Sequence, residues 1–201
     1  MENNEKKKSM GWTIRHDVQY QVNRLLKEKK TGAGKEALAN LRRGAARKMS
    51  ESIDSLRYVY QNLSDEILDS PKAREAVFVA MTMFAFHQQG DSSAPRTAEG
   101  GSIGTALREY LNKTQQTSPE EEDRMAKKLG SLLKAKSVYE ASRYLKSLIA
   151  LIKSAKEPIA IDYARLASDL YKFQYANSRD EVILCWAKDF YKKQQKNEEE
   201  K

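Results

Sequence analysis

The chain has 201 residues, of which 40% are hydrophobic and 32% are charged, and its formal net charge is +8. Nine glycines and four prolines are few for a protein built of strands and turns, and the one cysteine, Cys185, excludes an intrachain disulfide and a cysteine-rich metal site. The positive charge favours a polyanionic partner. The start of the chain lacks the apolar segment of a signal peptide, so we expect a cytoplasmic protein without a membrane span.

The first sixty residues are predicted to hold a disordered head and three amphipathic helices. Residues 1–12 are mostly polar or charged and show no apolar periodicity. Apolar side chains recur at helical spacing over residues 13–30, 36–46 and 52–63, which predicts a helix over each range. The second helix can also end earlier, at Gly44, if this glycine adopts the left-handed conformation that often follows a helix.

The segment Pro71–His87 is apolar on every side, because Thr82 is its one polar residue between positions 76 and 86. A surface helix has one apolar stripe, whereas a helix that is apolar all round must be covered all round. The segment is too short to cross a bilayer as a helix. Ser70 and Pro71 suit the N-cap and the first helical position. We therefore predict the buried central helix of a helical domain.

The second half of the chain is predicted to begin with a polar loop over residues 88–101 and to continue as helices. The expected N-caps, with the glutamate that completes a capping box where one is present, are Ser102, Ser118 with Glu121, Ser137 with Glu140, Asp162, and Ser178 with Glu181. The whole pattern predicts an all-α fold: a compact bundle of about eight helices. Two packed lobes would cover residues 13–90 and 102–192, followed by a charged tail over 193–201.

The residues that usually carry catalysis are sparse and isolated. Neither histidine, His16 or His87, has a partner at a metal-ligand spacing, and no glycine-rich phosphate-binding motif occurs. His87 ends the apolar segment, which favours a satisfied core or capping histidine. Cys185 is interpreted as a small buried hydrophobic residue rather than a reactive thiol. We therefore predict a protein that is not an enzyme, with no catalytic residues, no metal and no cofactor.

Positive charge is concentrated in two blocks of the sequence. Residues 1–48 hold 13 Lys and Arg against five acids, and residues 124–156 hold nine against one acid, Glu140. The alternative is a solvated helix face with local ion pairs, but one carboxylate cannot neutralise nine cations. Such a surface matches phosphate contacts, which position a nucleic-acid backbone without reading its bases.

Several strings in the sequence occur together and in order. They are ALANLRRG (37–44), FAFH (84–87), GGSIGTALREYL (100–111), LGSLLKAKSVYEASRYLKSLIALIKS (129–154), IDYARLASDLYKF (161–173) and VILCWAKDFY (182–191). This set resembles the CasB family, the small subunit of the type I-E CRISPR surveillance complex Cascade, over about residues 13–192.

The resemblance implies an all-α protein without catalytic activity, whose family packs two copies head to tail along the complex. It implies that the partners are the crRNA-containing Cascade complex with its backbone and large subunits, a second copy of the chain, and the target and non-target DNA strands. The family stabilises the R-loop, and cutting is done by a recruited helicase-nuclease.

The resemblance also implies nucleic-acid contacts for particular basic residues. Those that match basic positions of the family are Arg42, Arg43, Lys72, Arg74, Lys134, Lys136 and Lys172. Charge and position on the predicted helices add Arg108, Arg143 and Lys146. Two alternatives remain: a stand-alone helical nucleic-acid-binding protein, and a helical adaptor whose basic surface meets an acidic protein.

Overall fold

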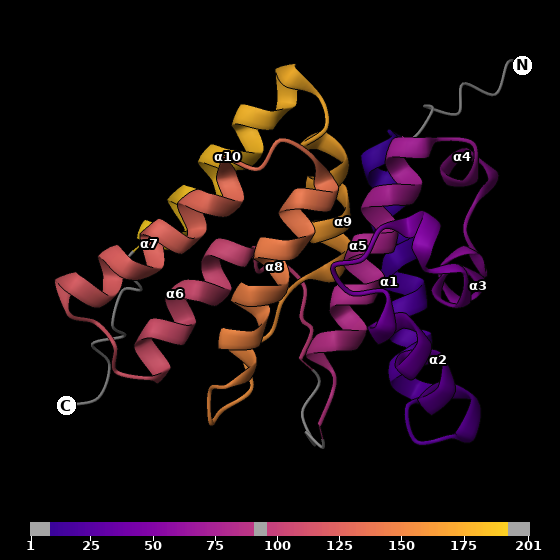
Figure 1. Cartoon of the computed structure of the whole chain (residues 1–201), viewed down its shortest axis with the longest axis horizontal. Helices are drawn as coiled ribbons and strands as arrows, with labels where there is room; N and C mark the ends of the chain where they lie inside the picture. The colour runs from indigo at the N-terminus through magenta and orange to yellow at the C-terminus, as the bar shows by residue number, and fades with distance from the viewer. Residues whose placement is uncertain (1–8, 91–95, 193–201) are drawn as a thin grey trace, which may run out of the picture.

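The computed structural model of the chain describes residues 9–90 and 96–192, and over these ranges it is all helical, without strands (Figure 1). This confirms the predicted fold class. The predicted tail, most of the predicted head and positions 91–95 of the predicted loop lie outside the described residues. In chain order the elements are α1 (Met10–Glu28), α2 (Gly32–Arg43), the 3-10 helix η1 (Met49–Glu51), α3 (Ile53–Tyr60), α4 (Asp65–Leu68), α5 (Pro71–His87), α6 (Ile103–Lys113), α7 (Pro119–Leu133), α8 (Val138–Lys153), α9 (Tyr163–Lys172) and α10 (Ala176–Tyr191).

Helix α5 is the centre of the fold, as predicted. It packs against α1, α2, α3, α4, α8 and α9, and every residue from 76 to 85 is buried. The Ser70 hydroxyl accepts a hydrogen bond from the Ala73 N–H at 3.3 Å, and Pro71 follows as the first helical residue. No helix in the described parts of the chain is long and apolar enough to cross a membrane.

The other helices surround α5 in two groups (Figure 1). Helices α1 to α4 lie on one side, and α6, α7, α8 and α10 on the other. Helix α9 follows α8 in sequence but packs against α1 and α5 as well as α10. The buried side chains consequently form one hydrophobic cluster that reaches from α1 to α10.

Two helices begin earlier than the apolar periodicity predicts. Helix α1 begins at Met10 instead of residue 13, because the Ser9 hydroxyl caps it by accepting from the Trp12 N–H at 3.3 Å. The last residues of the predicted head are therefore helical. Helix α2 begins at Gly32 instead of residue 36, because Thr31 caps it in the same way. These first turns face solvent, so the spacing of apolar residues in the sequence does not reveal them.

The capping predictions for the later helices are mostly confirmed. Ser102, Ser118, Ser137 and Asp162 all accept from a backbone N–H in the first turn of their helices. The capping box predicted at Ser178 is wrong. Helix α10 already begins at Ala176, and the Ser178 hydroxyl donates to the Lys172 carbonyl at 2.9 Å, which ties the helix start to the end of α9.

Gly44 ends α2, although in a different conformation from the one that the sequence suggests. Its φ is −76°, so it remains right-handed. A Cβ atom here would lie 2.8 Å from the Ser55 hydroxyl oxygen and 2.9 Å from the Thr82 methyl carbon. The absence of a side chain lets the end of α2 approach α3 and α5 closely. This close approach positions Arg42 and Arg43, the last two residues of α2.

Candidate nucleic-acid interface

Basic side chains from distant parts of the chain meet where α2, α5 and α8 approach one another. The ammonium nitrogens of Lys146 and Lys153, both on α8, lie 5.6 and 5.2 Å from the centre of the Phe86 ring on α5. Burial lowers the pKa of Lys153, and the positive charges of Arg96 and Arg42 lower this pKa further. We call Arg42, Arg96, Lys146 and Lys153 the cationic seam.

Neutral acceptors hold the side chains of the cationic seam in place. Lys146 donates to the Ala45 carbonyl at 3.1 Å, and Lys153 donates to the Gln89 side-chain oxygen at 3.1 Å. Arg96 donates to the Lys153 carbonyl at 3.5 Å. Within residues 9–90 and 96–192, no carboxylate forms an ion pair with any of the four. The positive charge of the seam is therefore available to an external anion.

Further basic residues extend the seam along α8. The Lys48 ammonium lies 5.9 Å from the Tyr139 ring centre at the start of this helix, and Arg143 is exposed one turn before Lys146. The turn between α7 and α8 exposes two of the predicted contact residues, Lys134 and Lys136. Glu140 accepts from the Lys136 backbone N–H at 2.7 Å and pairs with no cationic side chain of the described residues.

Three of the predicted contact residues lie elsewhere. Lys72, at the start of α5, has its ammonium 3.8 Å from the Tyr175 ring centre, and Arg74 donates to the Leu68 carbonyl. Fourteen residues of helix separate Lys72 from Phe86, which is about 21 Å at 1.5 Å per residue. Lys172, at the end of α9, is close to Gly11 of α1. Apart from Arg43 and Arg108, the basic residues that the sequence places in one set therefore lie in two regions, one near each end of α5.

Lys172 lines a cleft of about 560 Å³ between α1, α9 and α10. Asp169 and Glu181 line the same cleft, so positive charge does not dominate it. Cys185 also lines the cleft. It is partly exposed, and its sulfur accepts from Arg165 at 3.0 Å, which corrects the prediction that this cysteine is buried.

Arg108 does not belong to a contact surface. Its side chain is 9% exposed, its Nε donates to the Phe190 carbonyl at 2.6 Å, and its Nη2 forms an ion pair with Glu122 at 2.8 Å. These bonds join α6 to α10 and α7. The guanidinium is already used inside the protein, so this geometry does not favour the predicted nucleic-acid contact of Arg108.

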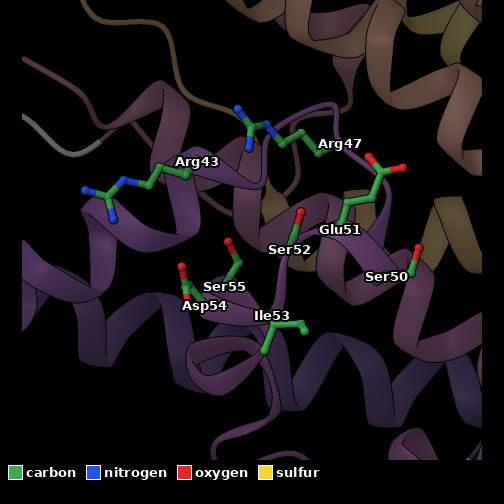
Figure 2. A pocket seen from close by; sticks show the side chains of 8 residues that line it. All are labelled: Arg43, Arg47, Ser50, Glu51, Ser52, Ile53, Asp54 and Ser55. Carbon is green, nitrogen blue, oxygen red and sulfur yellow. The ribbon is translucent and has the colours of Figure 1, made fainter.

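Arg43 lines a pocket of about 280 Å³ (Figure 2). The lining residues are Arg43, Arg47, Ser50, Glu51, Ser52, Ile53, Asp54 and Ser55. Arg43 donates to the Asn40 side-chain oxygen at 2.8 Å. The Ser52 and Ser55 hydroxyls donate to backbone carbonyls, and no imidazole or thiol lines the pocket. This arrangement offers no activated nucleophile. No group of side chains that could hold a metal ion occurs in the part of the chain described.

Two residues of the seam are absent from the predicted contact set. Lys153 follows Lys146 by seven residues, which is two helical turns, so the spacing places both beside the apolar face of the predicted helix, although Lys153 is not among the predicted contacts. Arg96 lies in a segment without periodicity. Only the return of this segment to the end of α8 brings it to the seam, and no sequence signal reports that return.

Comparison with known proteins gives a consistent result. The family model described as CRISPR-associated protein Cse2 matches residues 37–191, more than three quarters of the chain. Among solved structures, CasB from Thermobifida fusca has a TM-score of 0.71 at 21% identity, covering 90% of this chain and 98% of that protein. A CRISPR-associated protein of the Cse2 family from Thermus thermophilus has a TM-score of 0.64 at 21% identity, with 87% and 97% covered. A chain of a CRISPR RNA-guided surveillance complex has a TM-score of 0.66 at 18% identity, with 89% and 93% covered. No curated protein matches the sequence.

Proposed function

The chain belongs to the Cse2 family of CRISPR-associated proteins, and on this basis we propose that it is the non-catalytic small subunit of a type I-E CRISPR surveillance complex. In this role it binds nucleic-acid backbone without regard to sequence and stabilises the R-loop. Its partners are the crRNA-containing complex, a second copy of itself, and the target and displaced DNA strands, in the cytoplasm. The fold shared with a chain of an RNA-guided surveillance complex supports this assignment.

The cationic seam is the observation that carries the proposal. Arg96, Lys146 and Lys153 have neutral hydrogen-bond partners, and none of the four cations has a carboxylate partner in the described residues, so a phosphate chain can neutralise them without first breaking an ion pair. Holding a displaced strand of arbitrary sequence needs contacts to phosphates and no code for bases. R-loop formation exchanges one duplex for another of similar stability, so a few protein–phosphate contacts can shift the balance.

The test compares charge-neutral variants in the complex assembled with crRNA and the other subunits. The seam variant carries Arg42→Gln, Arg96→Gln, Lys146→Gln and Lys153→Gln. A matched control removes the same charge from exposed positions on or beside α1 and α7, with Lys27→Gln, Lys30→Gln, Lys127→Gln and Lys128→Gln. Size-exclusion chromatography first shows that both variants still join the complex.

We expect the seam variant to form less R-loop and to depend less on salt. Each lost phosphate contact on a single strand should flatten the slope of log binding constant against log salt by about 0.7. The control should behave as the wild type. An equal loss of R-loop formation in both variants would mean that only the total charge matters. An unchanged R-loop yield in the seam variant would contradict the proposal that the seam binds nucleic acid.

The second basic surface, formed by Lys72, Arg74 and Lys172, is proposed as a separate contact region. Because it lies about 21 Å from the seam along α5, its contribution to the free energy of binding should add to that of the seam. A Lys72→Gln and Lys172→Gln variant should therefore weaken R-loop formation by the same factor in the wild-type and in the seam-variant background. No effect in either background would restrict the interface to α8.

A further inference from the structure

Three buried nitrogen atoms near the C-terminal end of α5 have no hydrogen-bond partner. They are the side-chain nitrogen Nε2 of Gln88, the Nε of Arg96 and the Nε2 of His87. The first two are donors. His87 is 0% exposed, and its other ring nitrogen, Nδ1, lies 2.9 Å from the Tyr163 hydroxyl oxygen, so Nε2 is a donor in the tautomer in which this hydroxyl donates to Nδ1. Buried polar groups are usually hydrogen-bonded, so three unpartnered nitrogens at one place need an explanation.

The three nitrogen atoms belong to one junction. The Arg96 backbone N–H donates to the Gln88 side-chain oxygen at 3.5 Å, and the Arg96 guanidinium donates to the carbonyl of Lys153. Burial lowers the pKa of His87 to about 3, and the charges of Arg96 and Lys153 contribute to this lowering. The end of α5, the segment before α6 and the last turn of α8 therefore bring donors and two positive charges together.

We propose that His87, Gln88, Arg96 and Lys153 form an oxyanion socket, a site for one phosphate group. The inference rests on the proposed function, because in the complex the group would be one phosphate of a nucleic-acid backbone. A bound phosphate supplies acceptor oxygens for the Gln88 and Arg96 donors, and for His87 when Nε2 carries the hydrogen, and it supplies negative charge for Arg96 and Lys153. A water molecule can supply acceptors but leaves the two cations without a counter-charge.

A phosphate can replace the present hydrogen-bond partner of Lys153. Its ammonium donates to the side-chain oxygen of Gln89, which is neutral and belongs to an exposed residue. A charged phosphate oxygen is a stronger acceptor than this amide and can replace it. The socket lies beside Lys146 and Arg42 of the cationic seam, so a nucleic-acid strand that follows α8 can deliver a phosphate to it.

The experiment measures thermal unfolding of the full chain in inorganic phosphate and in chloride at equal ionic strength. The wild type should gain stability in phosphate with the saturation expected for one site. Lys153→Met should be more stable than the wild type in chloride, because a repulsive charge is removed, and should lose at least tenfold in phosphate affinity. Lys156→Met removes the same charge from an exposed neighbour and should bind phosphate as the wild type does.

A variant with unchanged net charge distinguishes a specific phosphate site from nonspecific electrostatic attraction of phosphate to the positively charged protein. Gln88→Met removes one of the donors and keeps the net charge, so its phosphate affinity should fall if the donors hold the anion. Wild-type affinity in Gln88→Met, or equal loss in Lys153→Met and Lys156→Met, would overturn the socket. A wild type that phosphate stabilises no more than chloride does would overturn it as well.

Competition identifies the source of the phosphate. An abasic oligonucleotide, which carries phosphodiesters without bases, should displace inorganic phosphate if the socket takes a backbone phosphate. Displacement supports the backbone role, and its absence limits the site to free phosphate and overturns that role. If Lys153→Met loses phosphate binding while the assembled complex still forms R-loops, the backbone role of the socket fails and the proposed function of the chain stands.

Discussion

The Nδ1 atom of His87 lies 2.9 Å from the hydroxyl oxygen of Tyr163, and this contact joins the end of α5 to the start of α9. Both side chains are buried, and Phe84 packs edge-on against the tyrosine ring with 5.5 Å between ring centres. Burial lowers the pKa of His87 to about 3, with smaller contributions from the charges of Arg96 and Lys153. The imidazole is therefore neutral in the folded protein at every pH above this value.

This neutral histidine should make the protein less stable in mild acid. Between pH 6.5 and about 3 the unfolded chain binds a proton at His87 and the folded chain does not, so acid favours unfolding. The free energy of unfolding should fall by up to about 1.4 kcal/mol per pH unit over this window from His87 alone. Urea unfolding of the wild type and of His87→Phe at several pH values measures the difference, because other titrating groups contribute equally to both proteins.

If His87→Phe showed the same slope as the wild type, the titration of His87 would not be the cause.

The sequence predicts the fold through features that are local to each helix. Helix α5 is found at its observed bounds because its residues are apolar all round, and the Ser118 capping box is found because its two bonds span only three residues. The start of α10 is missed because Ser178 bonds to the preceding helix instead of capping its own, and the sequence pattern is the same in both cases.

The candidate site is predicted less completely, for the same reason. Charge counting locates α8 as a basic helix, but it cannot show that Arg108 is used inside the protein by Phe190 and Glu122. It also cannot show that Arg96 returns to Lys153. Both facts depend on contacts between residues far apart in the chain, and such contacts carry no local signal.

Asp162 should be the most costly of the predicted N-caps to remove. One carboxylate oxygen accepts from the Arg165 N–H at 2.7 Å, and the other accepts from the Gly100 N–H at 2.8 Å and pairs with Arg15 at 3.4 Å. Asp162→Ala should lower the free energy of unfolding by about 2 kcal/mol or more. Ser118→Ala removes an exposed cap and should cost about 1 kcal/mol. Urea unfolding compares them, and equal losses would mean that the bond to Gly100 contributes nothing.

Gly104 should not tolerate alanine, whereas Gly130 should benefit from it. A Cβ at Gly104 would lie 2.0 Å from the Trp186 carbonyl oxygen and 3.0 Å from the Phe190 nitrogen, both backbone atoms of α10. Gly104→Ala would push α6 from α10 and should cost about 3 kcal/mol. Gly130 lies in α7 with nothing within 4 Å of the added atom, so Gly130→Ala should add about 0.5–1 kcal/mol. Thermal unfolding of both variants measures this opposite pair, and a stable Gly104→Ala protein would contradict the close packing.

Arg108 and Arg143 should separate stability from nucleic-acid binding. Arg108→Met removes the donor to the buried Phe190 carbonyl and breaks the ion pair with Glu122, and should lower the free energy of unfolding by about 2–3 kcal/mol. Its R-loop formation below the unfolding temperature should keep the salt dependence of the wild type, since the side chain is largely buried and already paired. Arg143→Met should leave stability unchanged within about 0.5 kcal/mol, because the residue is exposed, and should flatten the salt slope by about 0.7. If Arg108→Met flattened the dependence of binding on salt, Arg108 would have to contact a phosphate after all, since the loss of a phosphate contact is what flattens this dependence.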